Sequence, residues 1–232
     1  MRVVIAGQSK SGTTALYSLF RVLLPGHQYL FEPRAYQGDE QDIIIKGIVG
    51  ISSFEGMAHF DTKFLIVRDP RDNLVSRFLY APYDWPAAMR KERALGAFLT
   101  CLEAKRAEPD RISLVEMIPP AVLVEWLGLH RAALDWHDAH PAYTVIRYAD
   151  ALPAIVGIDP GRFGRVARRK ETGSWRDWFT ARDVEQLRPV YQSYMNRYGF
   201  GDDWELPAEQ HIKAEYSTEY VKRLCHERAI GK

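Results

Sequence analysis

Short runs of apolar, mostly β-branched residues alternate along the chain with segments that have helical periodicity. The apolar runs lie at residues 3–6, 27–31, 42–48, 63–67 and 143–148, and the helical patterns at 13–24, from 70 onward, 87–105, 121–140 and 181–198. Apolar runs of this kind are typical of parallel strands buried on both faces. The alternation predicts an α/β fold with three layers, in which helices flank a central, mainly parallel β-sheet.

A glycine-rich turn, from Gly7 to Gly12, joins the first strand to the first helix. Backbone N–H groups and the positive end of the helix dipole both favour an anion in such a turn. Its spacing matches the first half of the nucleoside-triphosphate loop, but Thr13 stands where that motif has lysine, and Lys10 lies inside the turn instead. We expect a P-loop-like phosphate-binding loop with a displaced cation. An ordinary tight turn with a solvated lysine is the alternative.

Length and composition set further limits. With 232 residues and 47% hydrophobic content, the chain can bury the core of one domain. The motifs of this domain lie within about residues 3–200. We assign no role to the tail at 204–232. A net charge of +1 argues against a broad nucleic-acid surface, and two distant cysteines argue against a disulfide framework. No apolar run spans a membrane, and no signal peptide is apparent, so we expect a cytoplasmic protein. The oligomeric state is not specified.

An acidic candidate follows the second strand. Pro33 restricts Glu32 to extended geometry and ends that strand. Because ligands in open α/β sheets bind beyond the carboxyl ends of the strands, Glu32 is a candidate general base, with a solvated loop carboxylate as the alternative. Glu55 and His59 are weaker acid–base candidates.

The fourth strand is followed by the sequence RDPRDNLVS, in which Arg68 and Ser76 are eight residues apart. A guanidinium and a hydroxyl from one strand–helix unit can clamp a second phosphate. The alternative is a charged helix start, with Asp69 and Asp72 complementing the dipole. A carboxylate after a hydrophobic strand, here Asp69, could also bind magnesium in a nucleoside-triphosphate site. That site would also need a lysine at position 13, where this chain has threonine.

The remaining candidates carry weaker signals. Residues 81–86 are expected to form a loop. His137 and His140 are three apart on a helix, but no third ligand lies nearby, so no metal site is expected. Residues 162–170 form a basic run that precedes a glycine and a tryptophan, which is compatible with an anion-binding loop; a solvated surface, the usual meaning of such a run, is the alternative. Its charged members are Arg162, Arg165, Arg168, Arg169 and Lys170.

Four segments in order resemble the sulfotransferases that use 3′-phosphoadenosine 5′-phosphosulfate (PAPS). KSGTT at 10–14 resembles their 5′-phosphosulfate loop, RDPRDNLVS their 3′-phosphate site, VIRYAD at 145–150 a strand whose tyrosine lies near adenine, and RRKETGSWRDWFT at 168–180 their late basic segment. The resemblance therefore implies donor-binding roles for Gly7, Lys10, Ser11, Gly12, Thr13, Thr14, Arg68, Ser76, Tyr148, Arg168, Arg169 and Lys170. Lys170 replaces a glycine of the family segment.

The resemblance also implies a reaction. Many cytosolic members carry Lys-Thr-His with a histidine base, whereas this chain has Lys46-Gly47-Ile48; LFEP at 30–33 is similar to an acidic element of the carbohydrate sulfotransferases. Glu32 is thus the expected base, and Lys10 the expected donor to the leaving phosphate oxygen. The implied activity is sulfuryl transfer from PAPS to a hydroxyl or amine of a carbohydrate or small metabolite, with adenosine 3′,5′-bisphosphate as product. A P-loop kinase or NTPase and a non-catalytic adenosine-bisphosphate-binding protein are the alternatives.

Overall fold

The structure is a computed structural model that describes residues 1–86, 92–159 and 171–229. The chain divides into two compact units. The first comprises Met1–Asp69 and Gly128–Phe163, and the second comprises Pro70–Leu127 and Gly164–Lys232. The assignment of the whole chain to one domain stays a prediction.

The first unit is built on a five-stranded sheet in the order β2-β3-β1-β4-β5. Every pairing is parallel. The strands are β1 (Arg2–Gly7), β2 (Gln28–Phe31), β3 (Ile43–Lys46), β4 (Thr62–Val67) and β5 (Thr144–Arg147). The predicted α/β fold class is confirmed.

Strand β1 occupies the centre of this sheet because its side chains are apolar on both faces. Val3, Val4, Ile5 and Ala6 have no exposed surface. From β1 the chain goes to the edge strand β2, returns to β3 beside β1, and then continues on the other side of β1 with β4 and β5. The order therefore reverses at β1, and the crevice at the carboxyl end of such a strand is where open α/β sheets bind ligands.

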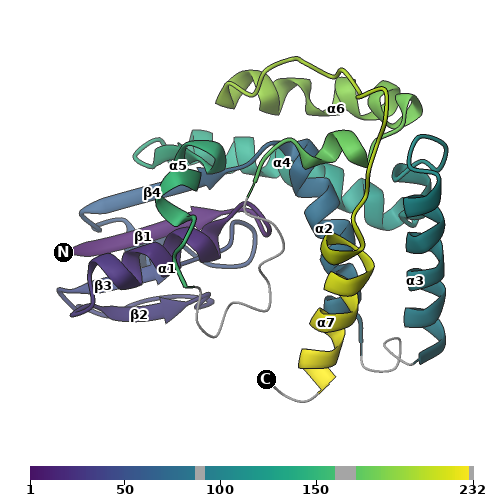
Figure 1. Ribbon diagram of the computed structural model, residues 1–232. Helices are drawn as coiled ribbons and strands as arrows, with labels where there is room; N and C mark the ends of the chain where they lie inside the picture. Colours follow the sequence, from purple (N-terminus) through teal and green to yellow (C-terminus); the bar gives the residue numbers. More distant parts are fainter. Residues whose placement is uncertain (87–91, 160–170, 230–232) are drawn as a thin grey trace. The chain divides into compact units, whose positions relative to one another are not determined.

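Two helices of the first unit begin at the edge of the sheet where this crevice lies. Helix α1 (Thr13–Leu23) packs against β1, β3 and α5 (Tyr148–Ile155), as Figure 1 shows. Tyr148 is thus the first residue of a helix, whereas the sequence predicted that it ends a strand. Strand β5 stops one residue earlier, at Arg147, and Asp150 in the first turn of α5 forms an ion pair with Arg147.

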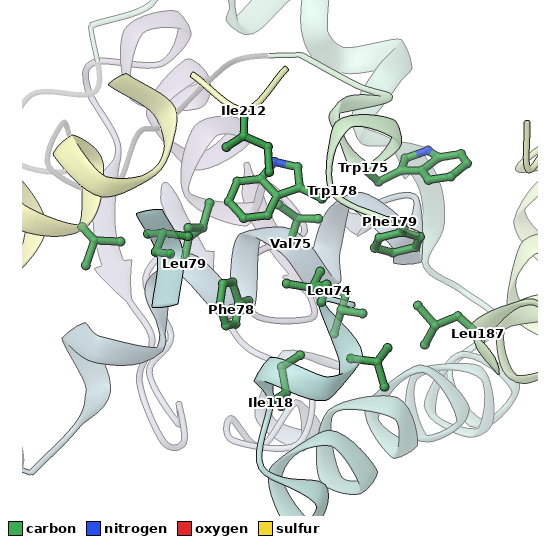
Figure 2. Close-up of a cluster of buried hydrophobic side chains, with 14 of the residues drawn as sticks. Leu74, Val75, Phe78, Leu79, Ile118, Trp175, Trp178, Phe179, Leu187 and Ile212 are labelled. Atoms are coloured by element: carbon green, nitrogen blue, oxygen red, sulfur yellow. The ribbon is translucent and has the colours of Figure 1, made fainter. Parts of the chain in front are cut away.

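The second unit is helical. Its helices are α2 (Pro70–Asp84), α3 (Glu92–Ala107), α6 (Ala181–Tyr198), α7 (Thr218–Ala229) and the first part of α4 (Pro120–Ala139). Figure 2 shows the core between them, in which one face of α2 meets aromatic side chains from the segment after residue 170. The labelled members are Leu74, Val75, Phe78, Leu79, Ile118, Trp175, Trp178, Phe179, Leu187 and Ile212.

One sequence prediction for this unit needs correction. The loop predicted at 81–86 begins later, because α2 continues to Asp84 with a buried Pro82 inside its last turn. A proline near the end of a helix costs one backbone hydrogen bond, and burial of its ring offsets that loss. The tail has a structural role: α7 packs against α2 and α3, and its Tyr220, Val221 and Leu224 are fully buried. None of the described helices has the length and apolar character needed to cross a membrane.

Candidate functional site

The turn after β1 has the geometry of an anion-binding loop. The hydroxyl and backbone N–H of Ser11 both donate to the carbonyl of Gln8, at 2.8 and 3.2 Å, and so close the turn. A side chain at Gly7 would lie 2.7 Å from the carbonyl oxygen of Ile66 on β4, so only glycine fits there. Lys10 (φ 66°) and Gly12 (φ 103°) both take left-handed backbone conformations, which turn the chain into α1.

Helix α1 starts at Thr13 with its first N–H groups uncapped. Gly12 has no side chain to accept from them, and the first turn contains no acidic residue. The first N–H groups of a helix have no partner within the helix and carry its positive dipole charge. The carboxyl end of β1 therefore presents a site that favours an anion.

Two residues from distant parts of the first unit lie against this turn. The guanidinium of Arg68, which follows β4, donates to the carbonyl of Lys10 at 3.3 Å and lies 4.9 Å from the ring centre of Tyr148. The Tyr148 ring in turn covers Gly12, since a Cβ added there would lie 2.4 Å from its Cδ2. Lys10, Arg68 and Tyr148, which the resemblance assigns to three different segments, thus lie close together in the first unit.

Arg68 is 7% exposed, and its Nε is buried without a hydrogen-bond partner among the described residues. A buried donor of a permanently charged group is costly to leave unsatisfied. Its position beside the uncapped start of α1 gives the site a second, independent preference for an anion.

Glu32 lies at the carboxyl end of the neighbouring strand pair and contacts a lysine. Its carboxylate pairs with the ammonium of Lys46, and its N–H donates to the Lys46 carbonyl at 2.7 Å. Sequence reasoning noted Lys46 only as part of an altered motif and missed this pair. The sequence carries no signal for it, because the pair depends on the register of the sheet: Phe31 and Lys46 are the last, aligned residues of β2 and β3, which places Glu32 beside Lys46.

The pair is asymmetric in its access to water. The Lys46 side chain is 3% exposed and the Glu32 side chain 38%. Burial lowers the pKa of Lys46, and the charge and hydrogen bond of Glu32 oppose that shift. The ammonium lies 4.1 Å from the ring centre of Phe31, which adds a cation–π contact. The ammonium of Lys46 therefore holds one carboxylate oxygen of Glu32, and the Glu32 side chain stays accessible to a substrate.

The two residues to which the sequence assigned chemistry share a backbone feature. Lys10 and Glu32, with φ values of 66° and 52°, are the non-glycine residues of positive φ in the part of the chain that the structure describes. The prediction that Pro33 holds Glu32 in extended geometry is therefore wrong, because Glu32 turns the chain away from β2 in a left-handed conformation. Such conformations cost of order 1–3 kcal/mol and concentrate at functional sites. This coincidence supports a role for both residues.

Other predicted donor-binding residues are not brought to this turn. Ser76 lies on α2 in the second unit, where it is buried, so its pairing with Arg68 stays a prediction. Arg168, Arg169 and Lys170 lie outside the described residues, as do Arg162 and Arg165. Thr13 is buried and Thr14 half-buried at the start of α1.

The weaker candidates have other surroundings. His59 is exposed and packs edge-on against Phe60. His140 stacks on Trp136 at 4.3 Å, whereas His137 is buried. Within residues 1–86, 92–159 and 171–229 no three His, Cys, Asp or Glu side chains are grouped to hold a metal ion.

Comparisons with known proteins were made by sequence and by structure. No protein-family model matches the chain, and no curated protein matches its sequence. A solved structure of similar fold is the crystal structure of mouse sulfotransferase SULT7A1 complexed with PAP, with a TM-score of 0.43 and 16% sequence identity. The similarity covers 84% of this chain and 84% of that chain.

Proposed function

We propose that the protein is a sulfotransferase that moves a sulfuryl group from PAPS to a hydroxyl or amine, on a carbohydrate or small metabolite. One observation carries the proposal: the uncapped start of α1 and the buried Arg68 guanidinium converge on the turn that holds Lys10. Both features favour an anion beside Lys10 at the carboxyl end of β1, which supports the proposal.

The residues at the turn fit the chemistry of the donor. The first N–H groups of α1 suit its 5′-phosphate, and the unsatisfied Nε of Arg68 supplies a donor to a further anionic oxygen. Tyr148, whose ring lies 4.9 Å from the Arg68 guanidinium, is the expected neighbour of the adenine from the family resemblance. Ser76, Arg168, Arg169 and Lys170 complete the proposed binding set as expectations from the family resemblance.

In the proposed reaction Glu32 is the general base. Its carboxylate takes the proton of the acceptor as the acceptor oxygen or nitrogen forms a bond to sulfur, and the bond from sulfur to the phosphate oxygen breaks. Lys10 donates a hydrogen bond to that oxygen as it gains negative charge. A positioned base contributes about 10²–10⁴-fold, and one preorganised donor to developing charge about 3–4 kcal/mol.

Lys46 has a supporting part in this scheme. Its ammonium fixes the carboxylate of Glu32 at the end of β2 and stays enclosed beside Phe31. Because Glu32 itself remains 38% exposed, it can exchange its proton with water after each turnover.

The alternatives are separated by two assays. A P-loop kinase or NTPase would be stabilised by ATP with Mg²⁺, whereas the proposal predicts stabilisation by adenosine 3′,5′-bisphosphate. Turnover is then measured with PAPS labelled in its sulfuryl group against a panel of sugars, phenols and amines. We expect transfer by the wild type and its loss in Glu32→Gln. Binding of the bisphosphate without transfer to any acceptor would instead favour a non-catalytic binding protein.

A further inference from the structure

The ring of Tyr148 contacts both groups that favour an anion at the turn after β1. A Cβ added to Gly12 would lie 2.4 Å from Cδ2 and 2.9 Å from Cε2 of this ring. The guanidinium of Arg68 lies 4.9 Å from the centre of the same ring. One side chain of the first unit therefore lies against the start of α1 and against the buried arginine at once.

At the start of α1 the ring stands where a capping side chain would be. Gly12 is the N-cap residue of this helix and makes no side-chain cap, and the carbons of Tyr148 lie at the position of its missing Cβ. A side chain at the N-cap normally accepts a hydrogen bond from one of the first N–H groups, which a ring carbon cannot do. The ring therefore covers the N-cap without capping the helix.

The same ring helps to enclose Arg68. Its guanidinium donates to the carbonyl of Lys10 at 3.3 Å, and Arg68 and Tyr148 are only 7% and 6% exposed. The Nε of Arg68 is buried and has no hydrogen-bond partner among the described residues. Because an unsatisfied donor of a charged group is costly, an anionic oxygen that reached Nε would stabilise the site. It can reach this buried atom only after one of the groups around it has moved.

Tyr148 is the group best placed to move. It is the first residue of α5, so no preceding helical turn restricts the rotamers of its side chain. The flanking residues Arg147 and Asp150 are joined by two hydrogen bonds, of 2.8 and 3.0 Å, which hold the backbone at this end of α5. Rotation about the Cα–Cβ bond of Tyr148 would therefore uncover the turn while both helices keep their backbone.

We propose that Tyr148 is a movable cover of the anion site, and that a phosphate-type anion displaces its ring from Gly12 and Arg68. Opening costs the packing of the ring against these two residues, and the hydrogen bond from Arg68 Nε to the anion offsets that cost. This inference rests on the proposed function in one respect, that the turn binds an anion. It adds a control of access, because a ligand without an anionic group gains nothing from opening.

Calorimetric titration of inorganic pyrophosphate into the wild type and Tyr148→Ala tests the cover. A nucleotide is a poorer probe, because the family resemblance expects Tyr148 beside its adenine. A site that is open about one-tenth of the time binds about tenfold more weakly than one that is always open. We expect Tyr148→Ala to bind pyrophosphate about tenfold more tightly than the wild type. Equal or weaker binding by the variant, or no binding by either protein, would overturn the inference.

Tyr143 provides a matched control in the same unit. It is also 6% exposed, and its ring centre lies 6.1 Å from that of Phe54 and 4.9 Å from that of Trp136. Tyr143→Ala thus removes an equally buried ring that packs on other aromatic side chains. We expect lower stability and unchanged affinity for pyrophosphate. An equal rise in affinity in both variants would overturn the inference, because it would reflect general loosening of the unit.

A measurement on the wild type keeps the test decisive if Tyr148→Ala does not fold. Tetranitromethane nitrates the Cε carbons of tyrosines that solvent can reach, and peptide mass spectrometry identifies the modified residue. With pyrophosphate present we expect nitration of Tyr148 to rise up to about tenfold, as the open fraction approaches one, and nitration of Tyr143 to stay unchanged. An unchanged rate at Tyr148 overturns the inference.

Failure of the proposed function would look different. Pyrophosphate would still uncover Tyr148 and bind the variant more tightly, but adenosine 3′,5′-bisphosphate would not bind the wild type. Binding of the bisphosphate by a wild type whose Tyr148 stays protected with pyrophosphate would instead leave the function standing and remove the cover.

Discussion

The ammonium of Lys46 meets the carboxylate of Glu32 where β3 and β2 end side by side. The two partners differ in exposure, 3% for the lysine side chain and 38% for the glutamate. Removing either partner therefore has different consequences for the one that remains.

This asymmetry predicts unequal losses of stability. Glu32→Gln leaves an enclosed ammonium without its counter-charge, which we expect to cost about 1–3 kcal/mol in the free energy of unfolding. Lys46→Met replaces the ammonium by an apolar chain of similar length and leaves a carboxylate that water can reach, so the expected cost is below about 1 kcal/mol. Urea unfolding of both variants at pH 7 measures the difference. A larger loss in Lys46→Met would contradict the assigned geometry.

Gly12 gives a second prediction, because the Tyr148 ring and the backbone both require glycine there. Gly12→Ala would place its Cβ 2.4 Å from the ring at φ 103°. The left-handed conformation alone costs about 1–2 kcal/mol, and displacement of Tyr148 should weaken binding of adenosine 3′,5′-bisphosphate at least about tenfold.

The control for Gly12 is another glycine of the first unit. A Cβ at Gly26 would meet nothing within 4 Å, and Gly26 has no positive φ. Gly26→Ala should leave both the thermal midpoint and the nucleotide affinity near the wild-type values. If Gly12→Ala behaves like Gly26→Ala in calorimetry and thermal unfolding, the contact between the turn and Tyr148 is wrong.

A pH prediction follows from Lys105 in the second unit. Its ammonium donates to the carbonyls of Pro109 and Ile112 at 2.6 and 2.5 Å. Burial lowers the pKa of Lys105 to about 8, against the opposing charges of Asp183 and Asp110. Between that pH and the ordinary lysine pKa of 10.5 the unfolded chain binds more protons than the folded one, so stability rises with pH.

The variant Lys105→Met isolates this contribution, because it cannot titrate there. One proton gives at most about 1.4 kcal/mol per pH unit, so the wild type should gain on the order of 2 kcal/mol relative to the variant between about pH 8 and 10. Chemical unfolding of both proteins across this range provides the measurement. A difference that stays constant with pH would mean that Lys105 has an ordinary pKa.

Local pattern was sufficient to predict much of the first unit. The β-branched run before Gly7 and the spacing of Gly7 and Gly12 identified β1, the turn and α1, since these depend on neighbours in sequence. The pairing of Lys46 with Glu32 depends on strand register, and the contact of Tyr148 with Gly12 joins residues more than a hundred positions apart. Neither follows from spacing along the chain.

The second unit was less predictable for the same reason. Asp72 has the pattern of a helix-capping carboxylate, but its partners come from residues 173–175. Trp204 and Tyr220 lie in a polar tail that gives little periodic signal, although tertiary packing buries both. Long-range burial, rather than local preference, decides these positions.

The central claim is that the turn carrying Lys10 binds the sulfuryl donor, and calorimetric titration of adenosine 3′,5′-bisphosphate tests it without knowledge of the acceptor. Lys10→Ala is compared with Lys63→Ala, a lysine on β4 that donates to the carbonyl of Ala58. The account predicts binding by the wild type and by Lys63→Ala, and at least about tenfold weaker binding by Lys10→Ala, as expected for loss of a charge-assisted hydrogen bond. No binding by the wild type, or equal affinity in Lys10→Ala, would contradict it.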